Sequence, residues 1–304
     1  FPEKWYKERW HPYVWHQLME CERIARDVGE YVGKRLWNRN AKWALDPVYK
    51  NKKRVFGTYV PDNDGYQRCV DISETVLEKE YGGKIEHRYD YLLDVARFPD
   101  QARQATIQFQ AAGVTTLINA CDTLSSRFLT ESADDINWGP EWFIIGVATQ
   151  DSDGAARTFD QAVVDGHLFG MSQLGATAGI EGKVGESYKS WKTAFPNEAT
   201  PRGFGAVYYR VLNLFVMLQA AGPILTPENI GKGLQAMPDG GGEKGAYGTW
   251  SFKGDHTAVD DSREIYWTTK KKGWDGNNGT YLETGGGKRY RAGEWPKTEP
   301  AIYP

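Results

Sequence analysis

The chain has 304 residues, which is enough for two domains of ordinary size or one large domain. Its 37 basic and 40 acidic residues nearly balance, and neither sign forms a long block, so the composition indicates no nucleic-acid or anionic-membrane partner. No apolar run approaches the roughly 20 residues that a membrane-spanning helix needs. The three cysteines allow at most one internal disulfide, and none sits in a CxxC motif typical of zinc or thioredoxin chemistry.

Residues 20–37 are the first predicted helix, because their apolar residues recur at steps of three and four residues. A loop follows, then a strand at 55–60 and a helix at 65–80 that two glycines close. The alternation continues with strands at 84–93, 114–120, 142–148 and 166–171, separated by helices at 100–113, 124–135 and 153–163. Strands alternating with helices predict βαβ units, so this is an α/β chain with a doubly wound parallel sheet.

After Met171 the pattern changes, and two further helices are predicted at 204–222 and 226–238. Thr226 is the expected N-cap of the second, with Pro227 at its first position. The first is strongly apolar and is expected to be buried through Val207, Val211, Leu214, Phe215 and Leu218. Neither helix has a parallel sheet of its own in this sequence. The tail from 248 onward predicts short strands and hairpins.

The turn after the first strand, PDNDGYQ, argues against a nucleotide cofactor, because its two carboxylates would repel a pyrophosphate. Two motifs, DNDG at 62–65 and DSDG at 151–154, resemble the start of a calcium loop but lack the glutamate of the twelfth position. Their acids are better explained as helix caps. The five histidines show no metal-binding spacing, and no hydrolase, P-loop or zinc-protease motif is present. We therefore expect no cofactor, no metal and no enzyme activity.

The loops at the carboxyl ends of the predicted strands are where an open parallel sheet binds ligands. Their side chains can hydrogen-bond a small zwitterion or amide and stack on its apolar part, but they form no evident proton-transfer pair. The set consists of Tyr66, Cys69, Cys121, Asp122, Thr123, Ser125, Thr149, Gln150 and Asp151. Binding without chemistry is the simpler interpretation.

Several segments of the sequence follow one another in the order found in a known protein family, which the chain resembles. Residues 52–67, 102–123, 142–150, 203–237 and 248–256 are together similar to the type I periplasmic solute-binding proteins, and more narrowly to the branched-chain amino acid receptors of ABC importers. The likeness runs from about residue 13 to residue 267. It rests on the succession of patterns rather than on an invariant signature.

The resemblance implies two α/β lobes that close on a solute, joined by three crossing segments. Residues 15–170 would form the second lobe, with the parallel sheet. Residues 1–14 and 171–260 would form a partial first lobe with hinge crossings, and 261–304 the third crossing and C-terminal strands or hairpins. Family members begin with further βα units, so an amino-terminal part of the first lobe is expected to be absent here, cleaved, unrecorded or carried by a separate chain.

The same resemblance assigns solute contacts to the carboxyl ends of the second lobe's strands. Tyr66 matches the family's cleft tyrosine, Asp122 or its neighbour Thr123 follows the third strand, and Ala148, Thr149 and Gln150 follow the fourth. The amino-acid receptors tend to hold an acid near Ala148 for the ligand ammonium, so Ala148 argues against a plain α-amino acid. In an exported protein Cys69 and Cys121 could form a disulfide, with Cys21 as a competing partner and free thiols as a further alternative.

The function implied is that of an extracytoplasmic solute-binding subunit of an ABC uptake system. The solute would be small and polar or aromatic, such as an amino acid, amide or aromatic acid, and the partner a membrane permease. The protein would be periplasmic or extracellular, and tethered to the membrane if a missing amino-terminal part carries an anchor. One alternative is a sensory or assembly module on the same fold, and a less favoured one is an α/β enzyme with an unrecognised catalytic pair.

Overall fold

The computed structural model describes residues 2–174, 183, 185–201, 203–241 and 248–303. They divide into two compact units: unit 1 comprises 1–20, 173–262 and 274–276, and unit 2 comprises 21–172, 263–273 and 277–304. The chain passes between the units at 20–21, 172–173 and 262–263, and again at 273–274 and 276–277 on either side of the short segment 274–276. The three crossing segments implied by the resemblance, and their role as a hinge, stay a prediction. The stretch 175–182 of the predicted first lobe lies outside the described residues.

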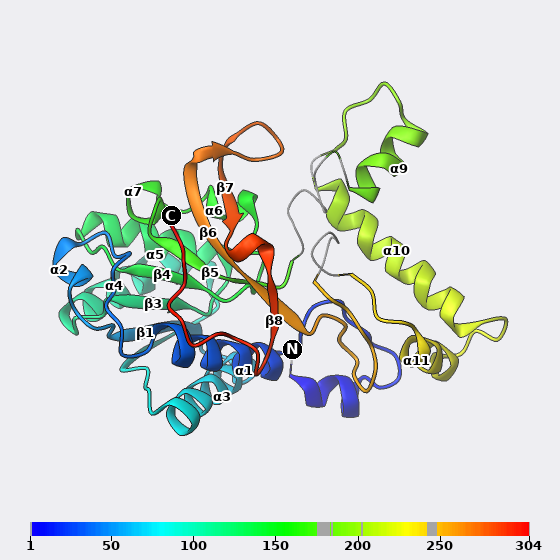
Figure 1. Cartoon of the computed structure of the whole chain (residues 1–304), viewed down its shortest axis with the longest axis horizontal. Helices are drawn as coiled ribbons and strands as arrows, with labels where there is room; N and C mark the ends of the chain where they lie inside the picture. Colours follow the sequence, from blue (N-terminus) through cyan, green and yellow to red (C-terminus); the bar gives the residue numbers. More distant parts are fainter. Residues whose placement is uncertain (1, 175–182, 184, 202, 242–247, 304) are drawn as a thin grey trace. The chain divides into compact units, whose positions relative to one another are not determined.

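Unit 2 is built on one mixed sheet (Figure 1). Its first five strands are parallel and lie in the order β2-β1-β3-β4-β5, a doubly wound order that confirms the predicted fold class. β6 pairs antiparallel with β5, β7 with β6, and β8 also pairs with β6. The strands are β1 Phe56–Pro61, β2 His87–Tyr91, β3 Thr116–Asn119, β4 Glu141–Ile144, β5 Leu168–Ser172, β6 Asp261–Lys272, β7 Asn278–Glu283 and β8 Arg289–Arg291.

Helices cover both faces of this sheet (Figure 1). The helices of unit 2 are α1 Cys21–Tyr31, α2 Pro47–Lys50, α3 Asp64–Tyr81, α4 Phe98–Ala111, α5 Thr123–Asp135, α6 Asp153–Ala156 and α7 Gln161–Val164. A π-helical turn, Val32–Leu36, continues α1. Successive strand residues point to opposite faces, so paired strands present rows of side chains. The row Leu117–Trp142–Leu168 lies in the core cluster of α4 and α5, and the row Ile118–Phe143–Phe169 in that of α1 and α3.

The helix ends follow local capping chemistry. Asn63 caps α3, because its side chain accepts a hydrogen bond from Gly65 N at 3.0 Å, and Ser152 caps α6 through Ala155 N. The two acidic motifs do lie at helix starts, as predicted, but the prediction that their acids are the caps is wrong: the capping side chains are Asn63 and Ser152, and an aspartate stands in the first helical turn of each. At its other end α3 stops at Gly82, whose φ of 64° a residue with a Cβ adopts at a cost.

The tail forms longer strands than the sequence predicted. β6 runs for 12 residues and completes the sheet of unit 2, where short strands and hairpins were expected. The reason is tertiary: β5 would otherwise be an edge strand with unpaired backbone groups, and β6 pairs with it from Phe169 to Ser172. β6 and β7 then form a hairpin, as expected.

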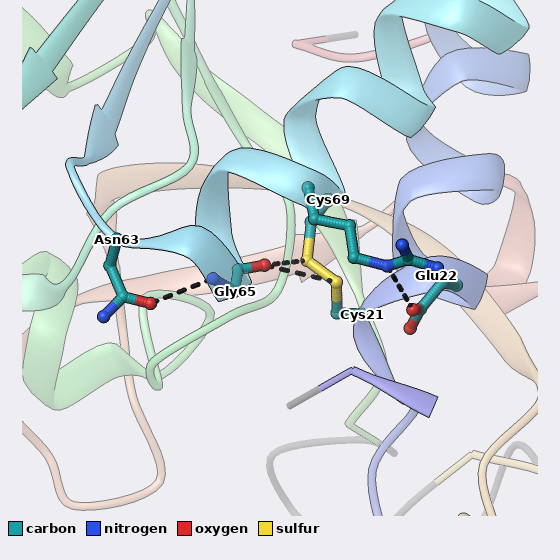
Figure 2. Close-up of a disulfide and its surroundings, with 6 residues drawn as sticks. Cys21, Glu22, Asn63, Gly65 and Cys69 are labelled. Carbon is teal, nitrogen blue, oxygen red and sulfur yellow. Dashed lines mark hydrogen bonds and ion pairs between the residues drawn. A yellow bond between two sulfur atoms is a disulfide. The ribbon is translucent and has the colours of Figure 1, made fainter. Parts of the chain in front are cut away.

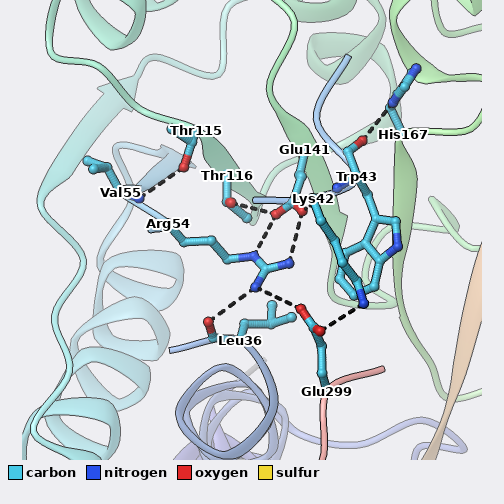
Figure 3. Close-up of polar contacts among 10 residues, drawn as sticks. All are labelled: Leu36, Lys42, Trp43, Arg54, Val55, Thr115, Thr116, Glu141, His167 and Glu299. Carbon is cyan, nitrogen blue, oxygen red and sulfur yellow. Dashed lines mark hydrogen bonds and ion pairs between the residues drawn. The ribbon is translucent and has the colours of Figure 1, made fainter. Parts of the chain in front are cut away.

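A buried ion pair fixes the amino-terminal edge of the sheet (Figure 3). Arg54 and Glu141 are both fully buried, and Arg54 Nε donates to Glu141 Oε2 at 2.7 Å. Glu141 also accepts hydrogen bonds from Thr116 Oγ1 at 2.7 Å and from Trp43 N at 3.0 Å. These donors satisfy the carboxylate, as a charge inside a protein requires. They tie the loop before β1 to the starts of β3 and β4.

Unit 1 contains the helices α9 Glu186–Ala194, α10 Phe204–Ala221 and α11 Pro227–Ala236. Thr226 caps α11 and Pro227 is its first residue, as predicted. The predicted burial of α10 is wrong for Val207, Val211, Leu214 and Phe215, which are 47% to 63% exposed. Met217 and Ala220 on α10 instead pack against Leu234 and Phe252, because only that side of the helix meets α11 and the segment around 250.

Candidate functional site

The carboxyl edge of the parallel sheet carries the residues that the sequence placed in a binding site. Tyr66 follows β1 in the first turn of α3, Thr123 follows β3 at the start of α5, and Ala148 and Thr149 follow β4. β1, β3 and β4 are neighbours in the sheet, so parallel pairing brings their carboxyl ends to one edge. Tyr66, Thr123, Ala148 and Thr149 are all exposed or partly exposed there.

Tyr66 is the aromatic side chain of this edge, and it is 38% exposed. Tyr66 N donates to Asn63 O at 2.9 Å, which holds the residue in the first turn of α3. Burial raises the pKa of the Tyr66 hydroxyl, and the charges of Asp122 and Cys121 raise it further. The ring therefore stays neutral at physiological pH and can both stack and donate a hydrogen bond.

Asp122 is the N-cap of α5 rather than an open carboxylate. Its Oδ1 accepts from Leu124 N and Ser125 N at 2.9 Å, and its Oδ2 accepts from Tyr91 Oη at 2.6 Å and Ser125 Oγ at 2.8 Å. Four donors already use this carboxylate, so an ammonium group would have to displace one of them. Asp122 thus fixes the turn at the start of α5. It also accepts a hydrogen bond from Tyr91, whose ring stacks on that of Tyr59 with the ring centres 4.3 Å apart.

The loop after β4 turns back in an unusual backbone conformation. Ala148 and Thr149 have φ of 49° and 63°, and Gln150 N donates to Val147 O at 3.0 Å across them. Positive φ at both central residues is the pattern of a type I′ turn, which normally uses Asn and Gly. Thr123 Oγ1 donates to Ala148 O at 2.7 Å and so links this turn to the start of α5. Strained residues of this kind concentrate at ligand sites.

Gln150 does not belong to the exposed edge. Its side chain is fully buried, and Nε2 donates to Cys121 O at 2.9 Å and to Ser126 Oγ at 2.8 Å. The residue faces inward because the turn at Ala148 and Thr149 reverses the chain just before it. We therefore leave Gln150 out of the candidate surface, although its position in the sequence suggested a solute contact.

Three exposed leucines were not recognised from the sequence as part of this edge. Leu92 and Leu93 follow β2, and Leu124 lies in the first turn of α5. They are 40% to 52% exposed. Their position directly after a predicted strand, or at the start of a predicted helix, could have indicated that they lie at this edge. Together with Tyr66 they give this edge an apolar character beside its hydroxyl and backbone groups, which suits a solute that has an apolar part.

The cysteine pairing corrects one prediction (Figure 2). Cys21 bonds to Cys69, with their Cα atoms 5.6 Å apart, and Cys121 is a free buried thiol, so the predicted bridge from Cys69 to Cys121 is wrong. The competing partner Cys21 wins because α1 and α3 pack side by side on the same face of the sheet. Cys121 points into a buried polar cluster with Asn119 and Ser126 instead.

Unit 1 has a pocket of its own. Its volume is about 250 Å³. The walls combine aromatic and aliphatic side chains with a few polar ones from α10 and the amino-terminal segment: Trp15, His16, Gln17, Arg210, Asn213, Leu214, Val216, Met217, Leu234, Trp250 and Phe252. No sequence motif pointed to it, because its walls come from four separate stretches of the chain.

Within the part of the chain that the structure describes, no group of three or more His, Cys, Asp or Glu side chains could hold a metal ion. None of the described helices is long and apolar enough to cross a membrane.

Comparison with known proteins was made at the levels of sequence and structure. No protein-family model matches the sequence, and no curated protein matches it. In contrast, 397 chains of solved structures match the fold. The structure therefore carries the similarity that the sequence comparisons miss.

Three of the solved structures illustrate the likeness. A solute-binding protein of an ABC transporter from Rhodopseudomonas palustris, in complex with 3,4-dihydroxybenzoic acid, has a TM-score of 0.63 at 13% identity, covering 96% of this chain and 70% of its own. A leucine-, isoleucine-, valine-, threonine- and alanine-binding protein from Brucella ovis has a TM-score of 0.57 at 16% identity, covering 92% of this chain and 65% of its own. An extracellular ligand-binding receptor from Verminephrobacter eiseniae has a TM-score of 0.57 at 15% identity, covering 88% of this chain and 68% of its own.

The chain thus has the fold of type I periplasmic binding proteins, as the resemblance implied, and it spans about two thirds of the length of these structures. The comparisons give no support to a separate chain for an amino-terminal part.

Proposed function

We propose that this chain, which has the type I periplasmic-binding-protein fold, is a solute-binding subunit of an ABC uptake system. The observation that carries the proposal is the carboxyl edge of the parallel sheet in unit 2. There Tyr66, Thr123 and the Ala148–Thr149 turn meet at the place where open α/β sheets bind ligands. Solute-binding proteins of the same fold act outside the cytoplasm with a membrane permease, and we propose the same location and partner here.

The edge favours a solute with an apolar part. Tyr66, Leu92, Leu93 and Leu124 offer exposed apolar surface, whereas Asp122, the carboxylate that follows β3, is occupied as a helix cap. A free acid for an ammonium group is missing at Ala148, so a simple amino acid fits this edge less well than an amide or an aromatic acid. The structures with similar folds were solved with ligands that include 3,4-dihydroxybenzoic acid and 4-hydroxybenzoate.

The proposal is tested by screening amino acids, amides, aromatic acids and fatty acids for an increase in the thermal unfolding temperature, followed by calorimetry. A solute at 100 times its Kd stabilises the folded protein by about 2.7 kcal/mol. Tyr66→Ala should weaken the binding of a hit, and His87→Gln, which lies on β2 away from this edge, is the matched control. Turnover of any compound would contradict a binding role. A protein that binds none of the panel but captures another protein would favour the sensory or assembly alternative.

A further inference from the structure

The disulfide lies against the carbonyl group of Gly65 (Figure 2). Gly65 O is 2.8 Å from Cys69 Sγ and 3.6 Å from Cys21 Sγ. A disulfide sulfur has no proton to donate, so these are packing contacts rather than hydrogen bonds. Gly65 O belongs to the peptide group that joins Gly65 to Tyr66. The bridge therefore touches the backbone directly before the candidate solute residue.

The same peptide segment is held from its other side. Asn63 Oδ1 accepts from Gly65 N at 3.0 Å, and Asn63 O accepts from Tyr66 N at 2.9 Å. Gly65 O is also the helical acceptor for Cys69 N, four residues on in α3. The first turn of α3 is thus held by its cap, by this helical hydrogen bond and by the bridge. Loss of the bridge would remove the covalent link from this turn to α1 and leave the cap and the helical hydrogen bond.

A second link beside the disulfide repeats the connection between α1 and α3. Arg68 Nε donates to Glu22 Oε1 at 2.9 Å, one residue along each helix from the two cysteines. Further along, Gly29 of α1 lies so close to α3 that an added Cβ would stand 2.7 Å from Ser73 O. These two contacts hold α1 against α3 with or without the bridge, so the bridge adds a covalent link at the end of α3 that carries the Tyr66 turn.

Cys21 is also the first residue of unit 2 after the first crossing. The residues just before it are held inside unit 1: Met19 N donates to Gln173 Oε1 at 2.8 Å, and Thr257 Oγ1 donates to Glu20 Oε2. The last residue of this unit 1 segment, Glu20, is therefore directly bonded to the disulfide cysteine Cys21. A change in chain direction at Glu20 would pass through Cys21 to the turn of Tyr66.

We propose that the Cys21–Cys69 bridge is a positioning link that fixes Tyr66 relative to the first crossing, so that reduction of this one bond loosens the Tyr66 turn and weakens solute binding. The expected loss of solute binding rests on the proposed function. The expected loosening of the Tyr66 turn does not depend on any solute.

Two measurements on the full chain test it, each on the oxidised protein, on the reduced protein and on the double variant Cys21→Ala/Cys69→Ala. Amide hydrogen exchange of the peptide that covers 62–70 should become about tenfold faster without the bridge. The Kd for the solute found above should rise about tenfold. In a double-mutant cycle with Tyr66→Ala, the two losses in affinity should not add, because the bridge acts through Tyr66.

Leu77→Ala is the matched control, because it removes a buried side chain from the same helix, α3, far from the Tyr66 turn. It should lower the unfolding temperature without changing the exchange of 62–70 or the Kd. Unchanged exchange after reduction would overturn the positioning link whether or not a solute is found. Faster exchange with an unchanged Kd would overturn its effect on binding. If the oxidised protein binds no solute, the proposed function fails, and the exchange result still decides the positioning link.

Discussion

Cys121 shows at the residue scale how burial decides reactivity. The thiol is fully buried, and burial raises its pKa to about 12. Thiolate is the reactive form of cysteine, so almost none is present at pH 8. We expect a thiol reagent to label no cysteine in the oxidised native protein, one in denaturant, and three in denaturant with a reductant. Labelling of the native protein, or three thiols without reductant, would contradict the pairing of Cys21 with Cys69.

The turn at Ala148 and Thr149 makes a second prediction at the residue scale. A residue with a Cβ at positive φ costs about 1–2 kcal/mol, and glycine avoids that cost. We expect Thr149→Gly to leave the free energy of unfolding unchanged or to raise it by up to about 1 kcal/mol, as measured by urea unfolding. Thr75→Gly, in the helix α3, should instead lower it by about 0.3 kcal/mol, the difference in helix propensity between threonine and glycine. Marked destabilisation by Thr149→Gly would show that its side chain contributes more than the strain costs.

At the scale of elements, the Arg54–Glu141 pair joins the loop before β1 to β3 and β4 (Figure 3). Removing Glu141 leaves the buried Arg54 with Glu299 alone, a partly exposed carboxylate whose Oε1 lies 3.6 Å from Arg54 Nη1. We expect Glu141→Gln to lower the free energy of unfolding by about 3–5 kcal/mol. Glu131→Gln, which removes an exposed pair with Arg127, should change it by less than about 1 kcal/mol. Equal effects of the two variants in denaturant unfolding would refute the role assigned to the buried pair.

The amino-terminal segment of unit 1 is linked to the segment around 256 by a pair of histidines. His11 Nδ1 lies 2.8 Å from His256 Nε2, and the buried His256 ring stacks on Trp15 at 4.5 Å. The pKa of His256 is lowered, first by burial and then by His11 and Lys7, against the opposing effect of Asp255. A histidine whose pKa is lower in the folded protein than in the unfolded chain stabilises the fold above the unfolded pKa of about 6.5.

That stabilisation is lost as the pH falls below about 6.5, because the unfolded chain then binds the proton more readily. We expect the unfolding temperature to decrease between pH 7 and pH 5, and the decrease to be smaller in His256→Gln. The comparison of slopes, rather than of unfolding temperatures at one pH, separates titration from lost packing. Equal slopes in His256→Gln and wild type would remove His256 from the pH dependence.

At the scale of the whole molecule, the proposed binding role predicts a change in dimensions. Closure around the ligand is the usual response of periplasmic binding proteins, so solute binding should reduce the radius of gyration. We expect small-angle scattering to show this decrease with saturating solute, and Tyr66→Ala to need more solute for the same change. Binding by calorimetry with no change in the radius of gyration would place the solute on one unit only and contradict closure.

The sequence by itself determined the alternation of helices and strands in unit 2, the fold class, the N-cap at Thr226, and the position of the two acidic motifs at helix starts. These depend on periodicity and on contacts within a few residues, which the local sequence contains. Only the tertiary structure decided that Cys69 bonds to Cys21, that Gln150 faces inward, that β6 completes the sheet, and that α10 exposes an apolar face. Each of those outcomes depends on which distant segment packs against the residue, and the spacing of residue types along one chain does not specify that.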